Sequence, residues 1–416
     1  MSTLLSVDEA KRKILGNFTV LETETSPINT VYGRTLAENI VSGMDLPLFP
    51  NSSMDGYTVR SIDVEGATHD KPQTLKVVDD IPAGKVSQLT IEEGQASRIM
   101  TGAPIPAGAD AVIPIEDTDQ FNLGRQSEPL PLEIKVIRSI RKGDYIRQKG
   151  EDIQSGEIIL SSGKRIRPQE VGLLAMLGIT EIPVVRQPRI AIMSTGDELV
   201  PIDMPLQAGQ IHDSNTYTLH AQIVRDGGDP IHAGIASDLE SAVFDGLANA
   251  VSSEVDLILS TAGVSVGAFD FVKSVVEQNG YVEFWRVNMR PGKPLTFGYF
   301  QGIPFIGLPG NPVSAFVSYE IFVRPAIFRM SGIENADQLI LQVRLIDPIE
   351  SDGRESYLRA FVKRQEDQWI ARLTGHQGSG NLRSLIQANA LLVIPSGVKS
   401  LPSNSIVNAI MFNDFG

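Results

Sequence analysis

The sequence contains no cysteine, which excludes disulfides, thiolate metal sites and cysteine nucleophiles. It also lacks long apolar runs, because segments such as 255–260 and 303–308 are strand-sized and well short of the ~20 residues that span a bilayer. The first ten residues include Asp8 and Glu9 and no apolar core stretch, so a secretory signal is not expected. We therefore expect a cytoplasmic protein without a membrane partner.

Positive charge is scarce. There are 36 Lys and Arg residues against 50 Asp and Glu residues, which gives a formal net charge of -14. Nucleic acid and anionic membranes would repel such a chain at long range, so neither is an expected partner. An anionic small ligand then requires a local cluster of basic residues.

Several catalytic motifs are missing as well. The sequence has neither the glycine-lysine P-loop nor a Gly-x-Gly-x-x-Gly after a strand, which disfavours nucleotidases and dinucleotide oxidoreductases. The five histidines show no paired metal spacing on one helix face, and we interpret His212, near the predicted pocket, as structural. Gly263-Val-Ser265-Val-Gly267 has the letters of a hydrolase elbow. Its preceding strand ends too early and the only later histidine, His376, falls in a predicted β region, so a hydrolase is disfavoured.

What the sequence does contain indicates a multidomain α/β plus β protein. The 416 residues include 37 glycines and 25 prolines, typical of short strands and tight turns. Ser6 and Glu9 form a capping box for an N-terminal helix, and another helix is expected over 168–178. The predicted domains are an elongated discontinuous domain (1–44 with 139–178), an inserted β domain (45–138), an α/β domain (179–330) and a C-terminal β-barrel (331–416).

The α/β domain is the clearest part of the pattern. Strands are predicted at 190–194, 230–235, 255–260 and 303–308, and helices alternate with them. One helix is expected to be capped by Ser237 with Glu240, and another by Asn311 with Pro312 at its first position. This alternation predicts a doubly wound parallel sheet.

Three loops follow strands of this sheet, where ligands of open α/β sheets bind. They are residues 194–198, 260–267 and 307–312. Glycines permit close backbone approach, and helix-start N–H groups favour phosphate. Taken alone, each loop is as well explained by an ordinary strand–helix turn as by ligand binding. Three such loops in one domain favour a shared pocket.

Carboxylates border this predicted pocket. Glu198 and Asp270 would repel a phosphate unless a cation lies between them, and Mg²⁺ suits that position. For Asp213 and Asp238, stabilisation of a helix N-terminus is as good an interpretation as function. The segment 286–294, with Arg286, Arg290 and Lys293, supplies the basic cluster that an anionic ligand needs.

Taken together, these stretches resemble the molybdopterin molybdenumtransferase family, which includes bacterial MoeA and the E domain of gephyrin. The matching pieces lie in order along nearly the whole chain: Ser53-Met-Asp-Gly-Tyr57, Thr101-Gly-Ala-Pro104, Gly108-Ala-Asp-Ala-Val112, Gly150-Glu-Asp-Ile153, Ser194-Thr-Gly-Asp-Glu-Leu199, Gly263-Val-Ser-Val-Gly267 with Asp270, Arg290-Pro-Gly-Lys-Pro294 and Gly307-Leu-Pro-Gly-Asn-Pro-Val-Ser314.

The resemblance implies the four-domain layout and a homodimer whose active site lies between subunits. It implies Mg²⁺-dependent insertion of molybdenum from molybdate into adenylylated molybdopterin with release of AMP, downstream of a molybdopterin-adenylylating enzyme. Carried over by motif, the catalytic positions are Asp55, Thr101, Asp152, Asp238 and Asp270, and the metal ligands are Glu198 and Asp270. The implied substrate contacts are Thr195, Gly263, Ser265, Gly267, Arg286, Arg290, Lys293, Pro309, Asn311, Ser314, Arg354, Arg359 and Ser384.

The sequence departs from many relatives at Ala262, where they carry glycine, and at Arg286 and Arg290, where they carry lysine. Arginine keeps the charge but changes donor geometry, which leaves tungstate as an alternative oxyanion. A scaffold module of the gephyrin E type and a nucleotidyl-transferring or pyrophosphatase-like enzyme are the alternatives of other classes. The start at Met1 disfavours the scaffold module, and the domains that surround the α/β domain disfavour the nucleotidyl-transferring or pyrophosphatase-like enzyme.

Overall fold

The computed structural model describes residues 4–121, 129–262, 271–333 and 339–412. The chain forms two compact units. The first contains residues 1–38, 162–174 and 179–416, and the second contains residues 39–161 and 175–178.

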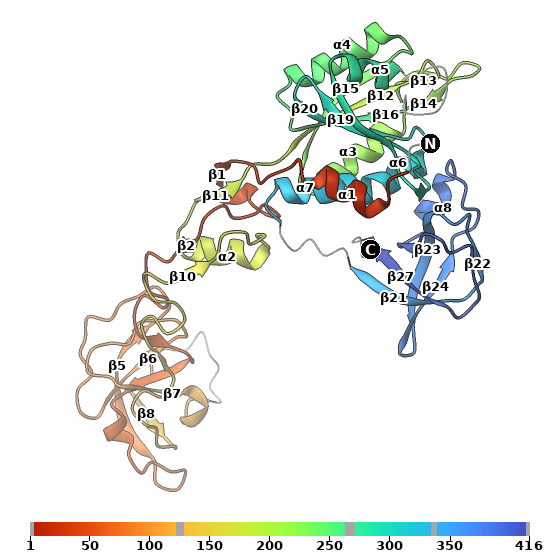
Figure 1. The fold of residues 1–416 in the computed structure, drawn as a ribbon. Helices are drawn as coiled ribbons and strands as arrows, with labels where there is room; N and C mark the ends of the chain where they lie inside the picture. Colours follow the sequence, from red (N-terminus) through yellow and green to blue (C-terminus); the bar gives the residue numbers. More distant parts are fainter. Residues whose placement is uncertain (1–3, 122–128, 263–270, 334–338, 413–416) are drawn as a thin grey trace. The chain divides into compact units, whose positions relative to one another are not determined.

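A six-stranded sheet forms the centre of the first unit (Figure 1). In spatial order its strands are β15 (Asp229–Ala236), β12 (Arg189–Thr195), β16 (Leu257–Thr261), β20 (Ile303–Leu308), β19 (Pro294–Phe300) and β17 (Gly280–Arg286). The first four run parallel; at one edge β19 pairs antiparallel with β20, and β17 pairs antiparallel with β19. The predicted parallel core is therefore confirmed, and the sheet as a whole is mixed.

Helices cover both faces of this sheet, as Figure 1 shows. Alternate residues of β12 explain why: Ile190 and Ile192 enter one apolar cluster, whereas Ala191 and Met193 enter another. The first cluster includes residues of α1 (Val7–Leu15), α3 (Asn215–Arg225), α6 (Pro312–Ser318), the π-helix η4 (Tyr319–Val323) and α7 (Arg324–Met330). The second includes residues of α4 (Glu240–Ser252) and α5 (Phe271–Gln278).

Two of the predicted helix caps can be compared with the structure. The capping box of Ser6 and Glu9 is present at α1, where Glu9 N donates to Ser6 Oγ over 3.2 Å. The box predicted at Ser237 is wrong, because Leu239 is the N-cap of α4 and makes no side-chain capping bond. Helix α4 thus begins at Glu240, so Glu240 is not the third helical residue that a capping box at Ser237 requires.

A closed five-stranded barrel follows the sheet in the first unit. Strand β23 (Glu355–Gln365) pairs with β24 (Gln368–Leu373) and also with β25 (Ala390–Ile394), and β21 (Ile340–Leu345) and β27 (Ile406–Met411) complete the ring. Strand β18 (Met289–Arg290), from the α/β part, pairs with the start of β23. The remaining elements of this region are β22 (Ile349–Glu350), β26 (Ser400–Leu401) and α8 (Leu382–Ile386).

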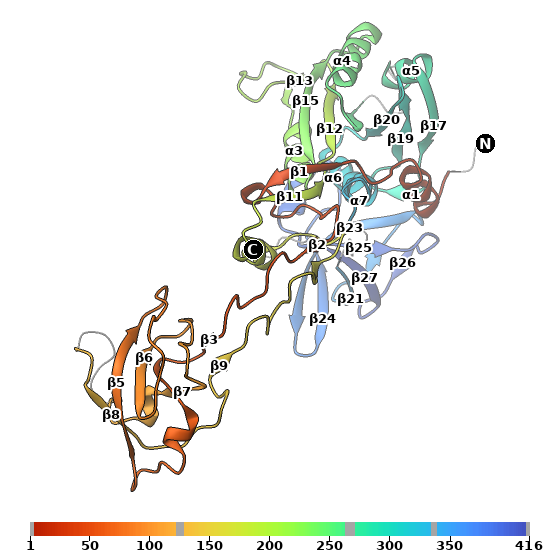
Figure 2. The ribbon, with the colours of Figure 1, turned by 90° about the vertical axis from the view of Figure 1, so that its left-hand side faces the viewer.

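The rest of the first unit contains a two-stranded ladder of β1 (Thr23–Pro27) and β11 (Glu181–Val185), which lie side by side in Figure 2. The short 3-10 helix η1 (Ile28–Thr30) follows β1. Helix α2 (Pro168–Met176) contributes residues to both units and agrees with the helix expected over 168–178.

The second unit is built on a five-stranded sheet. Its order is β7 (Ala111–Pro114), β4 (Gly56–Val59), β6 (Gln95–Ile99), β5 (Gln73–Ile81) and β8 (Glu133–Val136). Its other elements are η2 (Ser61–Val64), η3 (Ile115–Asp117), the ladder of β3 (Asn51–Ser52) with β9 (Ile146–Arg147), and the ladder of β2 (Ile40–Val41) with β10 (Ile158–Leu160). A buried cluster around Tyr57, Leu75 and Ile134 forms its core.

The predicted fold class, an α/β sheet with an additional β region and a C-terminal barrel, is confirmed. The exact boundaries of the four predicted domains stay predictions. Within the described ranges, no helix combines the length and the apolar character that crossing a membrane requires.

Candidate active site at the carboxyl edge of the sheet

A cavity of about 390 Å³ lies at the carboxyl ends of the parallel strands. It joins all three of the loops singled out in the sequence: Glu198 comes from the first, Thr261 and Ala262 from the second, and Pro309 to Pro312 from the third. The other lining residues are Leu199, Ile211, His212, Asp213, Ser214, Asn215 and Pro294. Parallel strands that end at one edge bring these loops together.

The first loop depends on a glycine. Gly196 follows β12 with φ +143°, and a Cβ there would lie 2.5 Å from Glu198 Oε2. A side chain at position 196 would displace the Glu198 carboxylate from the backbone and would strain a φ that L residues rarely adopt. The short strands β13 (Leu199–Val200) and β14 (Ile211–His212) then lead from this loop to α3.

A chain of buried hydroxyl groups runs beneath the cavity. Ser194 Oγ lies 2.9 Å from Thr261 Oγ1 and 3.0 Å from Thr216 Oγ1. Thr216 Oγ1 donates to Asp213 Oδ2 over 2.6 Å. Because Asp213 also accepts from the backbone N–H of Thr216, the structure favours the helix-capping interpretation of this carboxylate. The predicted contact Thr195 is buried and donates to the carbonyl of Thr261 rather than facing the cavity.

Asn215 is a residue that the sequence analysis missed. It lines the cavity, and its Nδ2 donates to the carbonyl of Gly310 over 2.7 Å. Its Oδ1 is buried without a hydrogen-bond partner among the described residues. A buried amide oxygen without a donor is costly, which marks a place where a ligand donor would be favourable. In the sequence, only the position of Asn215, two residues after the possible helix cap Asp213, could have pointed to it.

The second loop is only partly described. Ala262 adopts φ +69°, a left-handed conformation that favours glycine. The predicted residues Gly263, Ser265, Gly267 and Asp270 lie outside the described residues.

The third loop ends in α6, as expected. Asn311 is the N-cap and Pro312 the first residue of the helix, although the Asn311 side chain makes no capping bond. Pro309 and Asn311 line the cavity, and Ser314 is buried in α6. The N–H of Val313 donates to the carbonyl of Ser379, which connects this helix start to the barrel.

The predicted basic residues Arg286, Arg290 and Lys293 lie on β17, on β18 and in the turn before β19, and none of them lines the cavity. Lys293 directly precedes the cavity residue Pro294. Gly292 has φ +103°, and a Cβ there would lie 2.6 Å from Ser318 Oγ, so the turn before Lys293 requires glycine. The guanidinium of Arg286 lies 3.7 Å from the ring centre of Trp285, and the ammonium of Lys273 lies 4.6 Å from the same ring. Trp285 and Lys273 were not predicted as site residues.

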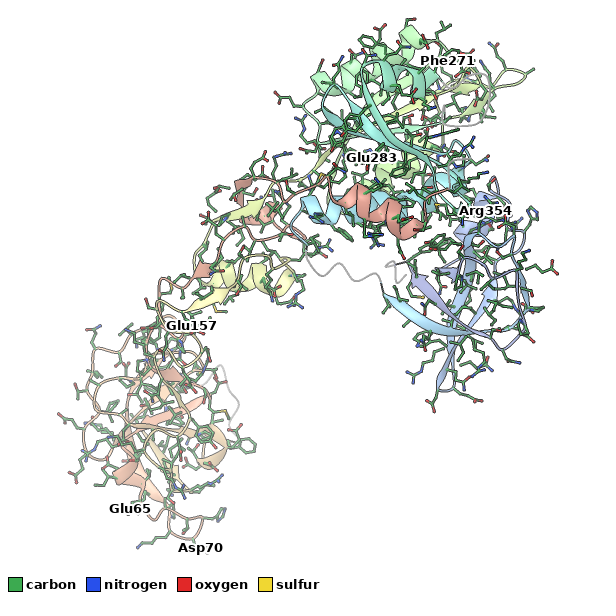
Figure 3. All side chains as sticks on the ribbon, in the orientation of Figure 1. Glu65, Asp70, Glu157, Phe271, Glu283 and Arg354 are labelled. Carbon is green, nitrogen blue, oxygen red and sulfur yellow. The ribbon has the colours of Figure 1, made fainter. Side chains whose placement is uncertain are left out.

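A second group of arginines lies where β18 meets the barrel. Arg290 and Arg354 both pair with Asp352, and Arg354 is labelled in Figure 3. The Arg354 side chain is the main reason that the pKa of Asp352 is lowered. Arg354 and Arg290 keep 32% and 41% of their side-chain surface exposed, so both remain accessible to an anion.

Arg359 is fully buried in the barrel. Its Nε donates to Ser384 Oγ over 3.0 Å, and its other nitrogens donate to the carbonyls of residues 376–378. Burial, and then the positive charge of Arg290, lower the pKa of Arg359 to about 10. Arg359 and Ser384 therefore contact each other directly, and both side chains are buried.

The predicted residues of the second unit also form pairs. The backbone N–H and the hydroxyl of Thr101 both donate to Asp55 Oδ1, over 2.8 and 2.7 Å. Arg147, on β9, forms an ion pair with Asp152. Strand β9 pairs with β3, which ends three residues before Asp55, so the two pairs lie on neighbouring segments.

Two further predicted positions have local partners. The N–H of Asp238 donates to Asp197 Oδ1 over 3.1 Å, and Asp238 is not among the residues that line the Glu198 cavity. His212 Nε2 lies 2.9 Å from the carbonyl oxygen of Met204, a contact that fits a structural histidine.

The described part of the chain contains no group of three or more His, Cys, Asp or Glu side chains arranged to hold a metal. Of the two predicted metal ligands, Glu198 is described and faces the cavity. A magnesium ion commonly binds to one or two carboxylates and completes its coordination with substrate phosphates and water, so a single described carboxylate fits such a site.

Comparison with known proteins gives a consistent result over nearly the whole chain. Residues 5–178 match the family described as "MoeA N-terminal region (domain I and II)", residues 191–329 match "Probable molybdopterin binding domain", and residues 342–412 match "MoeA C-terminal region (domain IV)". The chain is 37% identical to molybdopterin molybdenumtransferase 2 of Mycobacterium tuberculosis over 94% of its length and 96% of the relative's.

The chain is also 35% identical to the molybdopterin molybdenumtransferase of Bacillus subtilis, over 99% of its own length and 95% of the relative's. Among solved structures, the molybdopterin biosynthesis moeA protein of Pyrococcus horikoshii OT3 superposes with a TM-score of 0.79. That alignment covers 99% of this chain and all of the other at 31% identity.

Proposed function

Because the chain belongs to the molybdopterin molybdenumtransferase family of molybdenum cofactor biosynthesis, we propose that it inserts molybdenum from molybdate into adenylylated molybdopterin and releases AMP. The observation that carries the proposal is the cavity in which three strand-end loops meet beside Glu198. The substrate brings its own dithiolene sulfurs, so a chain without cysteine can perform the insertion.

The cavity supports binding of a phosphate-bearing ligand. The start of α3 and, in the turn, Gly310 and Asn311 border it with backbone N–H groups, which favour oxyanions. Asn215 fixes the turn through its bond to Gly310 and offers a buried acceptor to the ligand. Lys293, Arg286 and Arg290 provide the positive charge that the acidic chain otherwise lacks.

We assign magnesium to Glu198 and Asp270, of which the structure describes the first. A bound magnesium ion would neutralise the charge of the phosphate oxygens as the anhydride is cleaved. Glu198 holds its carboxylate at the cavity because Gly196 lets it fold back.

Molybdate is assigned to the arginine group at the start of the barrel. Arg290 and Arg354 are accessible there, whereas Arg359 is held by backbone carbonyls and by Ser384 and orders the loop of residues 376–378. We also propose a homodimer in which the Asp55 and Thr101 pair of one subunit, with Asp152, faces the cavity of the other. The adenylylated substrate requires an adenylyl-transferring enzyme upstream.

The proposal is tested by incubating purified protein with adenylylated molybdopterin and measuring released AMP. We expect AMP release only when both molybdate and Mg²⁺ are present. Replacing molybdate with tungstate in a parallel sample measures the oxyanion preference. AMP release that proceeds equally without any oxyanion would contradict the proposal, because it would indicate simple hydrolysis.

A further inference from the structure

Two histidines meet at the edge of the α/β sheet, and neither of them lines the Glu198 cavity. His220 lies on α3 and His232 on β15, and their rings are nearly perpendicular with centres 5.0 Å apart. His220 Nδ1 and His232 Nε2 are 2.9 Å apart, so one nitrogen donates a hydrogen bond to the other. His232 is exposed and His220 is half-buried, which leaves the pair accessible to solvent.

The separation of the two nitrogens matches that of two ligands on one metal ion. Metal–imidazole bonds are about 2.0–2.1 Å long, so two nitrogens at a right angle around the metal lie about 2.9 Å apart, and at a tetrahedral angle about 3.3 Å. Binding moves the shared proton to the other nitrogen of the same ring. Both nitrogens then present lone pairs and no net proton is lost, and a rotation of the two rings turns these lone pairs from each other toward a metal ion that lies off the line between the nitrogens.

The surroundings hold the pair in place. Helix α3 packs on β12 and β15, and His232 is opposite Ile192 in the parallel register. The ring of Tyr217 packs edge-on against His232, with centres 6.1 Å apart. Ligands fixed by a helix and a strand lose little freedom when a metal binds.

We propose that His220 and His232 form a bidentate site for a divalent transition metal of the nickel, copper and zinc group. These ions favour neutral imidazole, and a right-angled pair suits the tetragonal geometry of nickel and copper. Water completes the coordination shell, since the described residues offer no third His, Cys, Asp or Glu in a metal-binding group.

The site also borders a second cavity. His232 lines a space of about 540 Å³ together with Asp197, Asp213 and Tyr217. The coordination positions that water occupies are available to a small oxygen- or nitrogen-donor ligand at this rim. The proposed site shares no ligand with the magnesium assigned to Glu198, although Leu199 and Asp213 line both cavities.

Calorimetric titration of the full, tag-free and chelator-treated protein with NiCl2, ZnCl2 and MgCl2 tests the proposal. One equivalent of Ni²⁺ or Zn²⁺ is expected to bind per chain, and Mg²⁺ is not expected to bind at these histidines. His220→Asn and His232→Asn should each weaken Ni²⁺ binding by at least about tenfold, because one of two protein ligands is lost. The control His69→Asn, at an exposed residue of the second unit, should bind as the unmodified protein does.

A second measurement covers the case of a variant that folds poorly. The chain has only five histidines, so selective ¹³C labelling of their rings gives five sets of NMR signals. Paramagnetic Ni²⁺ is expected to broaden those of His220 and His232 first. Equal broadening of all five, or unchanged Ni²⁺ affinity in His220→Asn, would overturn the assignment.

Discussion

Replacing Glu198 with glutamine is expected to slow AMP release by about 100-fold or more, a typical cost of losing one electrostatic contact to a reacting centre. Glutamine has nearly the same shape, so it fits beside Gly196 as glutamate does. It lacks the charge that holds a divalent cation against the phosphate. The measurement is the rate of molybdate-dependent AMP release at several Mg²⁺ concentrations.

Asp245→Asn is the matched control, because Asp245 is exposed on α4 and its loss also removes one negative charge. This variant should release AMP at the rate of the unmodified chain. If Glu198→Gln, with an unchanged melting temperature, were equally active, Glu198 would have no place in the reaction.

The largest effect on stability is expected at a buried network between α3 and the π-helix. Asp226 accepts from both Arg225 and Tyr319, and Arg324 Nε lies 3.2 Å from its Oδ1 without an aligned hydrogen bond. Glu320 accepts from Gln222, Arg225 and Arg324. Burial, and then the charge of Asp226, raise the pKa of Tyr319, which keeps its hydroxyl protonated as a donor.

Asp226→Asn leaves two arginines against one carboxylate in this network, so the free energy of unfolding should fall by about 3–5 kcal/mol. Asp226 is only 2% exposed, so water cannot compensate. Urea unfolding can be followed by fluorescence in a Trp369→Phe background, where Trp285 alone reports on the α/β sheet.

The control for this experiment is Asp367→Asn, which removes a fully exposed partner of Arg364. Surface pairs of this kind contribute little, so no measurable change in the urea midpoint is expected. An equally small effect of Asp226→Asn would show that the buried network does not stabilise the sheet.

Much of the fold could be predicted because its signals are local. The strands at 190–194, 255–260 and 303–308 are short apolar runs between turn residues, and the structure places strands over each of them. The meeting of three loops in one cavity followed from the rule that parallel strands end at the same edge. This prediction did not require knowledge of any other contact between distant residues.

What could not be predicted depends on contacts between segments that are distant in the sequence. Asn215 is recognisable as a cavity residue only once α3 has been placed against the Gly310 turn. The family resemblance implies Arg359 and Ser384 as separate candidates, whereas the hydrogen bond between them is visible only in the closed barrel.

The pair of His220 and His232 could not be predicted for the same reason, because its two members come from different elements. A search for paired spacing on one helix face finds nothing, because His220 and His232 come from a helix and a strand. The cap predicted at Ser237 was wrong for a related reason, since the pattern fits locally whereas the helix begins only at Glu240.

In the proposed function, the carboxyl edge of the α/β sheet holds the phosphate-bearing substrate. A crystal structure of the protein soaked with AMP, molybdate and Mg²⁺ tests this most directly. We predict that the AMP phosphate lies in the cavity between Glu198, Asn215 and the Pro309–Pro312 turn. A phosphate bound elsewhere, with that cavity holding only water at saturating AMP, would contradict the account.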